Sequence, residues 1–169
     1  MFTYAIILSV TDGDVMKTCF LFGHSDAPDL FAKLGWALEY CYDELGIRRF
    51  VAGSRGNFDT IEVFGGLLYL KGKHEDIELQ RLIAYHPALR RKELRVNEKI
   101  FDSTYYPGGL EKMPYVYAIR KANEIMVTKS DFVICYVCHP GNARNLLDYV
   151  KSKKVPYINL AEETRQLIL

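Results

Sequence analysis

One stretch, from Ala122 to Asn145, constrains the fold more than any other part of the chain. It reads in order as the end of an amphipathic helix, an apolar run at Phe132–Cys138, and a polar turn that opens another helix at about Ala143. A short apolar run that is rich in β-branched residues and bounded by polar ones is typical of a buried strand. Helix, buried strand and helix in succession predict an α/β fold with this strand inside a parallel sheet.

The polar turn at His139–Asn145 is the first candidate site. At the carboxyl end of a parallel strand, the following helix presents unpaired backbone N–H groups and a positive dipole end, which suit a phosphate or a carboxylate. The guanidinium of Arg144 and the side-chain amides of Asn142 and Asn145 add donors at the same place. The alternative interpretation is structural, because the same residues could simply make a turn in which an asparagine caps the helix.

Strand and helix patterns alternate along the rest of the chain. Strands are expected at residues 4–10, 17–22, 49–52, 78–85, 100–106 and 156–160, and helices at 28–45, 60–71, 114–129 and 143–153. This alternation predicts a Rossmann-like three-layer sandwich with a mostly parallel central sheet. A D-G turn signal at residues 12–13 predicts that an N-terminal extension, residues 1–16, adds a strand in a hairpin. Residues 17–169 are expected to form a single domain.

Three more polar turns follow predicted strands, at residues 23–25, 53–59 and 86. The turn at 53–59 holds two glycines and Arg55 just before a predicted helix, so it is a second place that suits an anion. Its structural alternative is that Asp59 only caps that helix. Because the carboxyl ends of parallel strands meet at one edge of a sheet, the four turns are expected to converge on one crevice.

Charge and cysteine content exclude several classes of partner. The net charge of +1, with 25% charged residues, argues against broad binding of nucleic acid or of an anionic membrane. The apolar stretch at residues 1–10 is too short to span a bilayer. The four cysteines do not resemble an extracellular disulfide framework, and Cys135 and Cys138 would point to opposite faces of a strand. We therefore expect a cytoplasmic protein with no metal site and no cofactor.

Several short segments have a recognisable order and spacing. They read C-F-L-F-G-H-S-D-A-P at 19–28, G-N-F-D at 56–59, Y-H-P at 85–87, Y-Y-P-G-G-L-E at 105–111, and A-N-E-I-M, S-D-F-V-I-C-Y and N-A-R-N within 122–145. In these segments the chain resembles the SLOG superfamily, named for the Smf/DprA and LOG proteins, and in particular its YpsA-like branch. The resemblance implies a Rossmann-like sheet that binds a nucleotide or a nucleotide-derived molecule at the edge described above.

The resemblance does not extend to the catalytic residues of the LOG enzymes. Those phosphoribohydrolases use an arginine on the helix before the strand and a glutamate just after a P-G-G-x-G-T turn. Here Ala122 stands at the arginine position, and the turn H-P-G-N-A-R-N carries no acid. The loss of an acid or base typically costs about 10²–10⁴-fold in rate, so hydrolysis by the LOG mechanism is not expected. The branch usually carries an arginine where this chain has Ser25, and Arg55 could replace that charge.

The predicted function is binding of a nucleotide or a nucleotide-derived small molecule, with phosphate held at the two helix starts. Arg144 and Arg55 would supply charge, and Tyr106 or Tyr136 would stack on the base. The predicted ligand-binding residues are Gly23, His24, Ser25, Gly53, Ser54, Arg55, Gly56, Asn57, Asp59, His86, Tyr106, Asn123, Tyr136, His139, Gly141, Asn142, Arg144 and Asn145.

Two other functions stay open. The first is a protein-interaction or regulatory module that keeps a vestigial crevice and binds a partner through its tyrosine-rich surface. The second is a hydrolase or transferase acting on a nucleotide N-glycosidic bond, with Asp59 or His24 as acid or base. A homodimer is expected in each case, because members of the family often self-associate.

Overall fold

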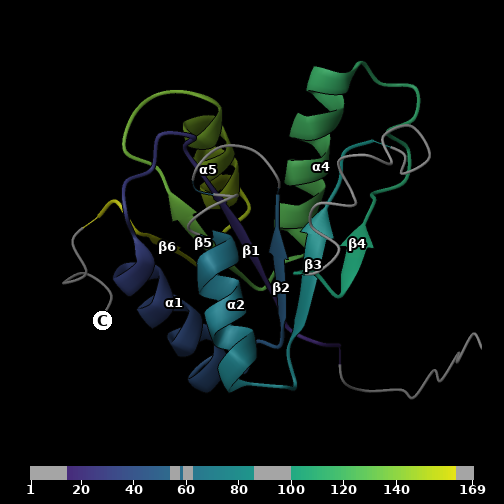
Figure 1. Ribbon diagram of the computed structural model, residues 1–169. Helices are drawn as coiled ribbons and strands as arrows, with labels where there is room; N and C mark the ends of the chain where they lie inside the picture. Colours follow the sequence, from purple (N-terminus) through teal and green to yellow (C-terminus); the bar gives the residue numbers. More distant parts are fainter. Residues whose placement is uncertain (1–14, 54–57, 59–62, 86–99, 163–169) are drawn as a thin grey trace, which may run out of the picture.

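The computed structural model describes residues 15–53, 58, 63–85 and 100–162 (Figure 1). The predicted N-terminal strand, its hairpin turn and the start of the predicted helix at 60–71 lie outside the described residues. The strands are β1 (Thr18–Gly23), β2 (Arg49–Ala52), β3 (Glu78–Leu82), β4 (Ser103–Tyr105), β5 (Phe132–Tyr136) and β6 (Tyr157–Asn159). The helices are α1 (Phe31–Asp43), α2 (Val63–Lys73), α4 (Tyr115–Lys129) and α5 (Asn142–Ser152).

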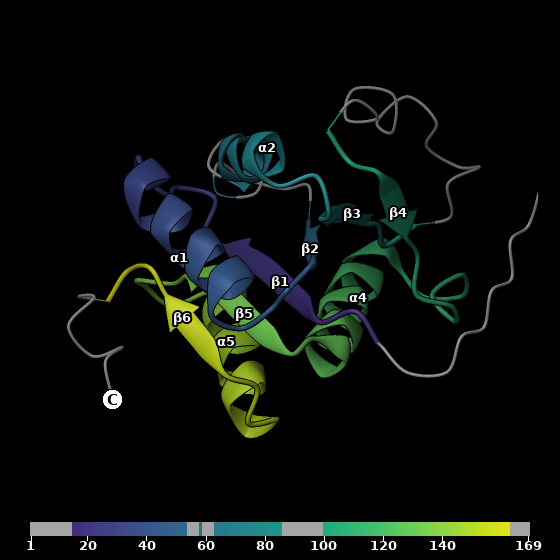
Figure 2. The ribbon, with the colours of Figure 1, turned by 90° about the horizontal axis from the view of Figure 1, so that it is seen from below.

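The described strands form one six-stranded sheet in the order β4-β3-β2-β1-β5-β6, and every pairing in it is parallel. Figure 2 shows α1 and α2 on one face of the sheet and α4 and α5 on the other. The predicted Rossmann-like three-layer sandwich is therefore confirmed. The chain runs outward from β1 to β4 and then returns to β5 on the other side of β1. The order thus reverses between β1 and β5, which makes this the topological switch point of the sheet.

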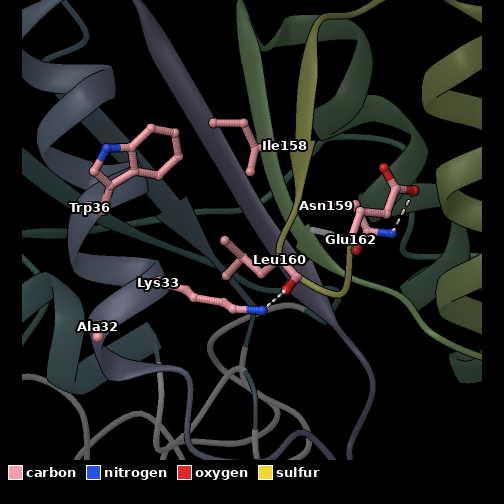
Figure 3. Close-up of a pocket in the computed structure, with 7 residues that line it drawn as sticks. All are labelled: Ala32, Lys33, Trp36, Ile158, Asn159, Leu160 and Glu162. Atoms are coloured by element: carbon pink, nitrogen blue, oxygen red, sulfur yellow. Dashed lines mark hydrogen bonds between the residues drawn. The ribbon is translucent and has the colours of Figure 1, made fainter. Parts of the chain in front are cut away.

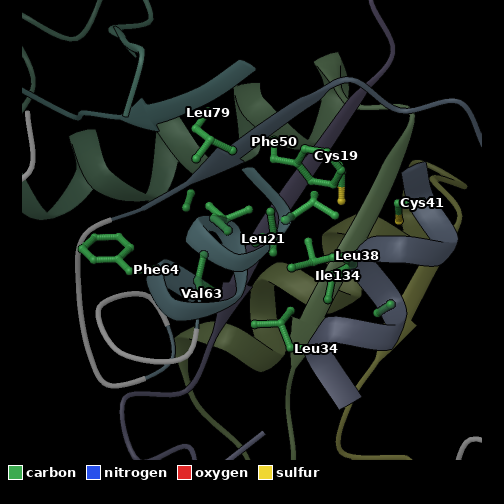
Figure 4. Close-up of a cluster of buried hydrophobic side chains, with 14 of the residues drawn as sticks. Cys19, Leu21, Leu34, Leu38, Cys41, Phe50, Val63, Phe64, Leu79 and Ile134 are labelled. Carbon is green, nitrogen blue, oxygen red and sulfur yellow. The ribbon is translucent and has the colours of Figure 1, made fainter. Parts of the chain in front are cut away.

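The central strands β1, β2 and β5 are buried on both faces because each face of the sheet carries its own core. Along β1 the side chains of Cys19 and Leu21 enter the cluster beneath α1 and α2, which Figure 4 shows, whereas Phe20 and Phe22 enter the cluster beneath α4 and α5. Burying one such large side chain contributes roughly 1.5–3 kcal/mol. A strand that is covered on both faces reads as a continuous apolar run, which explains why β5 could be recognised from sequence.

The α1–α2 contact depends on one of two adjacent glycines in α2. A Cβ on Gly66 would lie 2.8 Å from Leu34 Cδ2 and 3.1 Å from Leu38 Cδ1, whereas a Cβ on Gly65 would meet nothing within 4 Å. We expect Gly66→Ala to lower the free energy of unfolding by about 1–2 kcal/mol through overpacking. Gly65→Ala should raise it by about 0.5–1 kcal/mol, because alanine favours the helix.

Urea unfolding followed by circular dichroism measures both glycine variants. Opposite signs would confirm that the two helices approach at residue 66. If both substitutions stabilised the protein, the described α1–α2 packing would be wrong.

The start of α5 differs from the expectation. The structural alternative placed an asparagine at the cap, but Asn142 is the first helical residue and Gly141 occupies the N-cap, where no side chain caps the helix. Gly141 has a φ of 141°, in the region that favours glycine. The backbone N–H groups at this helix start are therefore not covered by a capping side chain.

Two further boundaries also differ from the prediction. The strand predicted at residues 78–85 ends at Leu82, and the helix predicted from residue 28 begins at Phe31. The backbone N–H of Phe31 donates to Asp29 Oδ1 at 3.0 Å, so the residues before the helix form a side-chain-stabilised turn instead of a first helical turn. Among the described helices, none has the length and apolar character needed to cross a membrane.

Candidate functional site

The carboxyl ends of β1 and β5 meet directly at the switch point. Gly23 is paired with Tyr136 in the parallel register, and the backbone N–H of His24 donates to the Tyr136 carbonyl at 3.0 Å. A Cβ on Gly23 would lie 2.7 Å from the ring of Phe58 and 3.1 Å from the Tyr136 oxygen, so no larger residue fits there. This close approach brings the turns after the two strands side by side, as the sequence predicted.

The two turns join through a pair of histidines. The imidazole rings of His24 and His139 stack with centroids 3.6 Å apart and planes 14° apart. His24 is only 6% exposed, and its Nε2 lies 3.0 Å from the His139 carbonyl oxygen and 3.4 Å from the His139 backbone nitrogen. Because a carbonyl only accepts, the shorter contact favours the tautomer in which Nε2 carries the proton and donates it.

His139 is exposed and has an acidic partner. Its Nε2 lies 3.1 Å from both carboxylate oxygens of Asp26, and its Nδ1 lies 2.8 Å from the Pro140 carbonyl oxygen. These two interactions, the carbonyl first, raise the pKa of His139 above its ordinary value, and the hydrogen bond from His139 lowers the pKa of Asp26. Burial, followed by the charge of His139, lowers the pKa of His24. The inner histidine therefore loses its proton more readily than a free imidazole, whereas the outer one keeps its proton more readily.

The start of α5 lies beside this pair. A Cβ on Gly141 would lie 3.8 Å from His24 Cε1. The helical hydrogen bonds begin with the backbone N–H of Asn145, which donates to the Gly141 carbonyl at 3.1 Å. By helix geometry, the N–H groups of Asn142, Ala143 and Arg144 have no acceptor within the helix. They point toward the carboxyl edge of the sheet, where an anion is stabilised by them and by the helix dipole.

Arg144 adds positive charge close to the histidines. Its charge is the smallest of the influences on the two histidines: it adds to the lowering of the pKa of His24, which burial causes first, and it works against the rise in the pKa of His139, which the Pro140 carbonyl causes first. Arg144 is half-buried, whereas Asn142 and Asn145 are exposed. The described part of this site is therefore rich in hydrogen-bond donors, and the exposed carboxylate of Asp26 is paired with His139 beside them.

The remaining predicted residues divide into three groups. Gly53 ends up just beyond β2, at the same sheet edge, and Ser25 is exposed in the turn after His24. Tyr106 follows β4 and packs against the core beneath α4 and α5. The strands β3 and β2 lie between β4 and the two strands that the histidines follow, and Asn123 lies in the middle of α4. Ser54, Arg55, Gly56, Asn57, Asp59 and His86 lie outside the described residues.

Tyr136 ends β5 and is half-buried at the site. Its ring lies 6.4 Å from that of Phe58, centroid to centroid, with planes 22° apart. A hydrogen bond with Cys138 is the main reason that the pKa of Tyr136 is raised. The tyrosine therefore lies at the carboxyl end of β5, partly buried against the core, in a position from which it could contact a base.

The site also contains residues that the sequence did not identify. Asn159 is buried at the end of β6; its Oδ1 accepts from the Val137 N–H and its Nδ2 donates to the Val137 carbonyl, both at 2.9 Å. It thereby fixes the backbone just before Cys138 and His139. In the sequence, the only indication of this role was that Asn159 interrupts the apolar run of the last predicted strand. Asp26 gave a weaker signal, as a polar residue in the turn after the strand at 17–22, and Cys138 was interpreted as part of the strand that follows residue 131.

Cys138 is exposed beside the histidines, whereas Cys135 is buried in β5. The predicted strand that was to hold both cysteines ends at Tyr136, so Cys138 lies in the turn beyond it. The four cysteines are free thiols. Ligand atoms of His24, Cys138 and His139 lie within 4.8 Å of one another, a group that the sequence did not predict. Two imidazoles and a thiol are together able to bind a transition-metal ion.

A separate pocket lies between α1 and β6 (Figure 3). It has a volume of about 250 Å³ and is lined by apolar side chains, among them Trp36 and Ile158, with the Lys33 ammonium donating to the Leu160 carbonyl at 3.3 Å. Pockets for drug-sized ligands commonly measure about 300–1,000 Å³, so this one suits only a smaller group. None of the predicted site residues lines it.

No family model matches the sequence, and no curated protein is significantly similar to it. The site is therefore assigned from its own geometry.

Proposed function

We propose that this chain binds a nucleotide or a nucleotide-derived small molecule at the switch point between β1 and β5. The observation that carries the proposal is the meeting of the stacked His24 and His139 with the start of α5, which no side chain caps, at one place. Phosphate groups favour this combination, because helix N–H groups and a nearby cation compensate their charge. Open parallel sheets commonly bind ligands at such a point.

Each group would have a distinct role in this proposal. The phosphate would accept from the N–H groups of Asn142, Ala143 and Arg144, with the Arg144 guanidinium completing the set. The carboxylate of Asp26 would accept from ribose hydroxyls, and the exposed side of the Tyr136 ring would face the base. A cytoplasmic location agrees with this ligand class, and the resemblance to the SLOG superfamily is a further reason to expect it.

Catalysis has less support. Ala122, at the position of the LOG arginine, is fully buried beneath the sheet, and residues 137–147 contain no acid. A hydrolase would have to use His24 or Asp59 as acid or base. Detection of free base or ribose phosphate after incubation with nucleotides would establish such an activity.

A second candidate function, protein interaction, is favoured by exposed side chains on α1 and α2. Phe31 is 50% exposed and contacts Tyr69 edge-to-face at 5.9 Å, and Leu68 and Trp36 are also about half exposed. Apolar side chains on adjacent helices suit a partner of similar character, and we propose a second copy of the chain. The mass of the protein in solution tests the proposed homodimer, and a monomeric mass at micromolar concentration would contradict it.

A thermal-shift panel tests the binding proposal. Mono-, di- and cyclic nucleotides and ADP-ribose would be compared at a hundredfold excess over Kd, where binding to the folded state alone adds about 2.7 kcal/mol. For a chain of this size, that should raise the melting temperature by several degrees. Absence of a shift across the panel would favour the protein-interaction function.

Arg144 provides the sharpest variant for this proposal. We expect Arg144→Gln to weaken the nucleotide that gives the largest shift by about 1.5–3 kcal/mol, because a charge-assisted hydrogen bond is lost. Isothermal titration calorimetry measures the affinity. Arg120→Gln is the matched control, since Arg120 is exposed on α4 and paired with Glu124. Equal affinities for the wild type and Arg144→Gln would remove Arg144 from the site.

A further inference from the structure

The turns after β1 and β5 also hold groups that can ligate a metal, and two of them, His24 and His139, belong to the proposed nucleotide site. His24 follows β1, and Cys138 and His139 follow β5, so the join between these strands brings two imidazoles and one thiol together, with their ligating atoms within 4.8 Å of one another. This is the ligand chemistry of zinc, which is bound in proteins by histidine nitrogen and cysteine sulfur. Cys138 is an exposed free thiol and is therefore open to solvent and to a metal ion.

Each imidazole is already oriented by an oxygen at one of its nitrogens. His24 Nε2 lies 3.0 Å from the His139 carbonyl oxygen, and His139 Nε2 lies 3.1 Å from the Asp26 carboxylate. Metal-binding histidines almost always donate their second N–H in this way, to a carbonyl or a carboxylate, which fixes the tautomer. The Nδ1 atoms of both rings are thus the ones left to coordinate a metal, after His139 Nδ1 exchanges the Pro140 carbonyl for it.

We propose that His24, Cys138 and His139 form a binding site for a zinc-class divalent metal ion at the carboxyl ends of β1 and β5. This proposal does not depend on nucleotide binding. The Cys138 thiolate and the Asp26 carboxylate together balance the two positive charges of the ion, and both the thiol and His139 Nδ1, which donates to the Pro140 carbonyl before the metal binds, release their protons to solvent.

Coordination requires only local movement of side chains. The ligand atoms now lie within 4.8 Å of one another. A tetrahedral zinc site, with bonds of about 2.0–2.1 Å to nitrogen and 2.3 Å to sulfur, would bring these atoms closer together than that distance. The stacked rings must turn so that both Nδ1 atoms face one point, and His139 and Cys138 are exposed enough to do so. Three protein ligands leave a fourth position for a solvent or ligand oxygen, as in open zinc sites.

Titration of the full chain with Zn²⁺ and Co²⁺ alone, without nucleotide, tests the site. We expect one ion per chain, and a thiolate-to-cobalt charge-transfer band in the near ultraviolet because sulfur is a ligand. Cys138→Ser should abolish the band, and both Cys138→Ser and His139→Gln should weaken Zn²⁺ binding at least tenfold. Asp26→Asn should keep the band but weaken Zn²⁺ binding by about 10–100-fold, because Asp26 only positions His139.

His74→Gln is the matched control, because His74 directly follows the C-terminal end of α2 and stacks on Tyr42 instead of on the histidine pair. It should leave affinity and spectrum unchanged. A wild-type cobalt complex without the band would overturn the proposal. So would equal Zn²⁺ affinity in the wild type, Cys138→Ser and His139→Gln. Because the titration contains no nucleotide, either result would contradict the metal site without testing whether the protein binds a nucleotide.

Discussion

Replacing Asn159 with alanine is expected to lower the free energy of unfolding by about 2–4 kcal/mol. The amide of this buried side chain pairs with both the N–H and the carbonyl of Val137, at 2.9 Å each. Alanine leaves both backbone groups buried without that partner, and each such group costs about 1–3 kcal/mol. Urea unfolding followed by circular dichroism measures the loss.

Asn145→Ala is the matched control for this prediction, because Asn145 is an exposed asparagine on α5 and its substitution should change stability by no more than about 0.5 kcal/mol. Asn159 also fixes the backbone that leads to Cys138 and His139, so ligand binding should weaken in the folded Asn159→Ala protein. A loss no larger than that of the control would mean that the Val137 backbone does not depend on Asn159.

Gly23→Ala is the second substitution with a large expected effect, a loss of about 1–3 kcal/mol. The new methyl group would lie 2.7 Å from the buried ring of Phe58 and 3.1 Å from the Tyr136 carbonyl, and the latter is backbone within the sheet. The strands or the ring must shift, which would also disturb the neighbouring His24.

Gly108→Ala serves as the control for Gly23→Ala, because a Cβ at that loop position would meet nothing within 4 Å. Thermal and urea unfolding should place Gly108→Ala close to the wild type and Gly23→Ala well below it. Wild-type stability of Gly23→Ala would show that β1 and β5 are not as close at their carboxyl ends as described.

Much of the fold could be predicted because its central strands are buried on both faces. The strand at Arg49–Ala52 has the predicted bounds, since its apolar residues enter two cores and polar residues flank it. The helix caps were harder to predict. Glycine at residue 141 and the side-chain turn at Asp29 decide where α5 and α1 begin, and both depend on local backbone conformation that composition alone does not specify.

The site could be predicted only in outline. His24, His139 and Arg144 meet because each follows a strand that ends at the same sheet edge, and this follows from the alternation of strands and helices. Asp26 and Asn159 were missed for a different reason. The contact of Asp26 with His139 depends on how a turn folds, and that of Asn159 on the register of β6, in which Cys135 is paired with Asn159.

The most direct test of the central claim is a titration of ¹⁵N-labelled protein with the nucleotide that gives the largest thermal shift, followed by two-dimensional NMR. Binding at the switch point predicts the largest changes at the amides of residues 142–144 and at the His24 ring. The Trp36 indole and the amides of Lys33 and Leu160, in the α1–β6 pocket, should stay unchanged. Changes confined to that pocket, or none at saturating nucleotide, would contradict the proposed site.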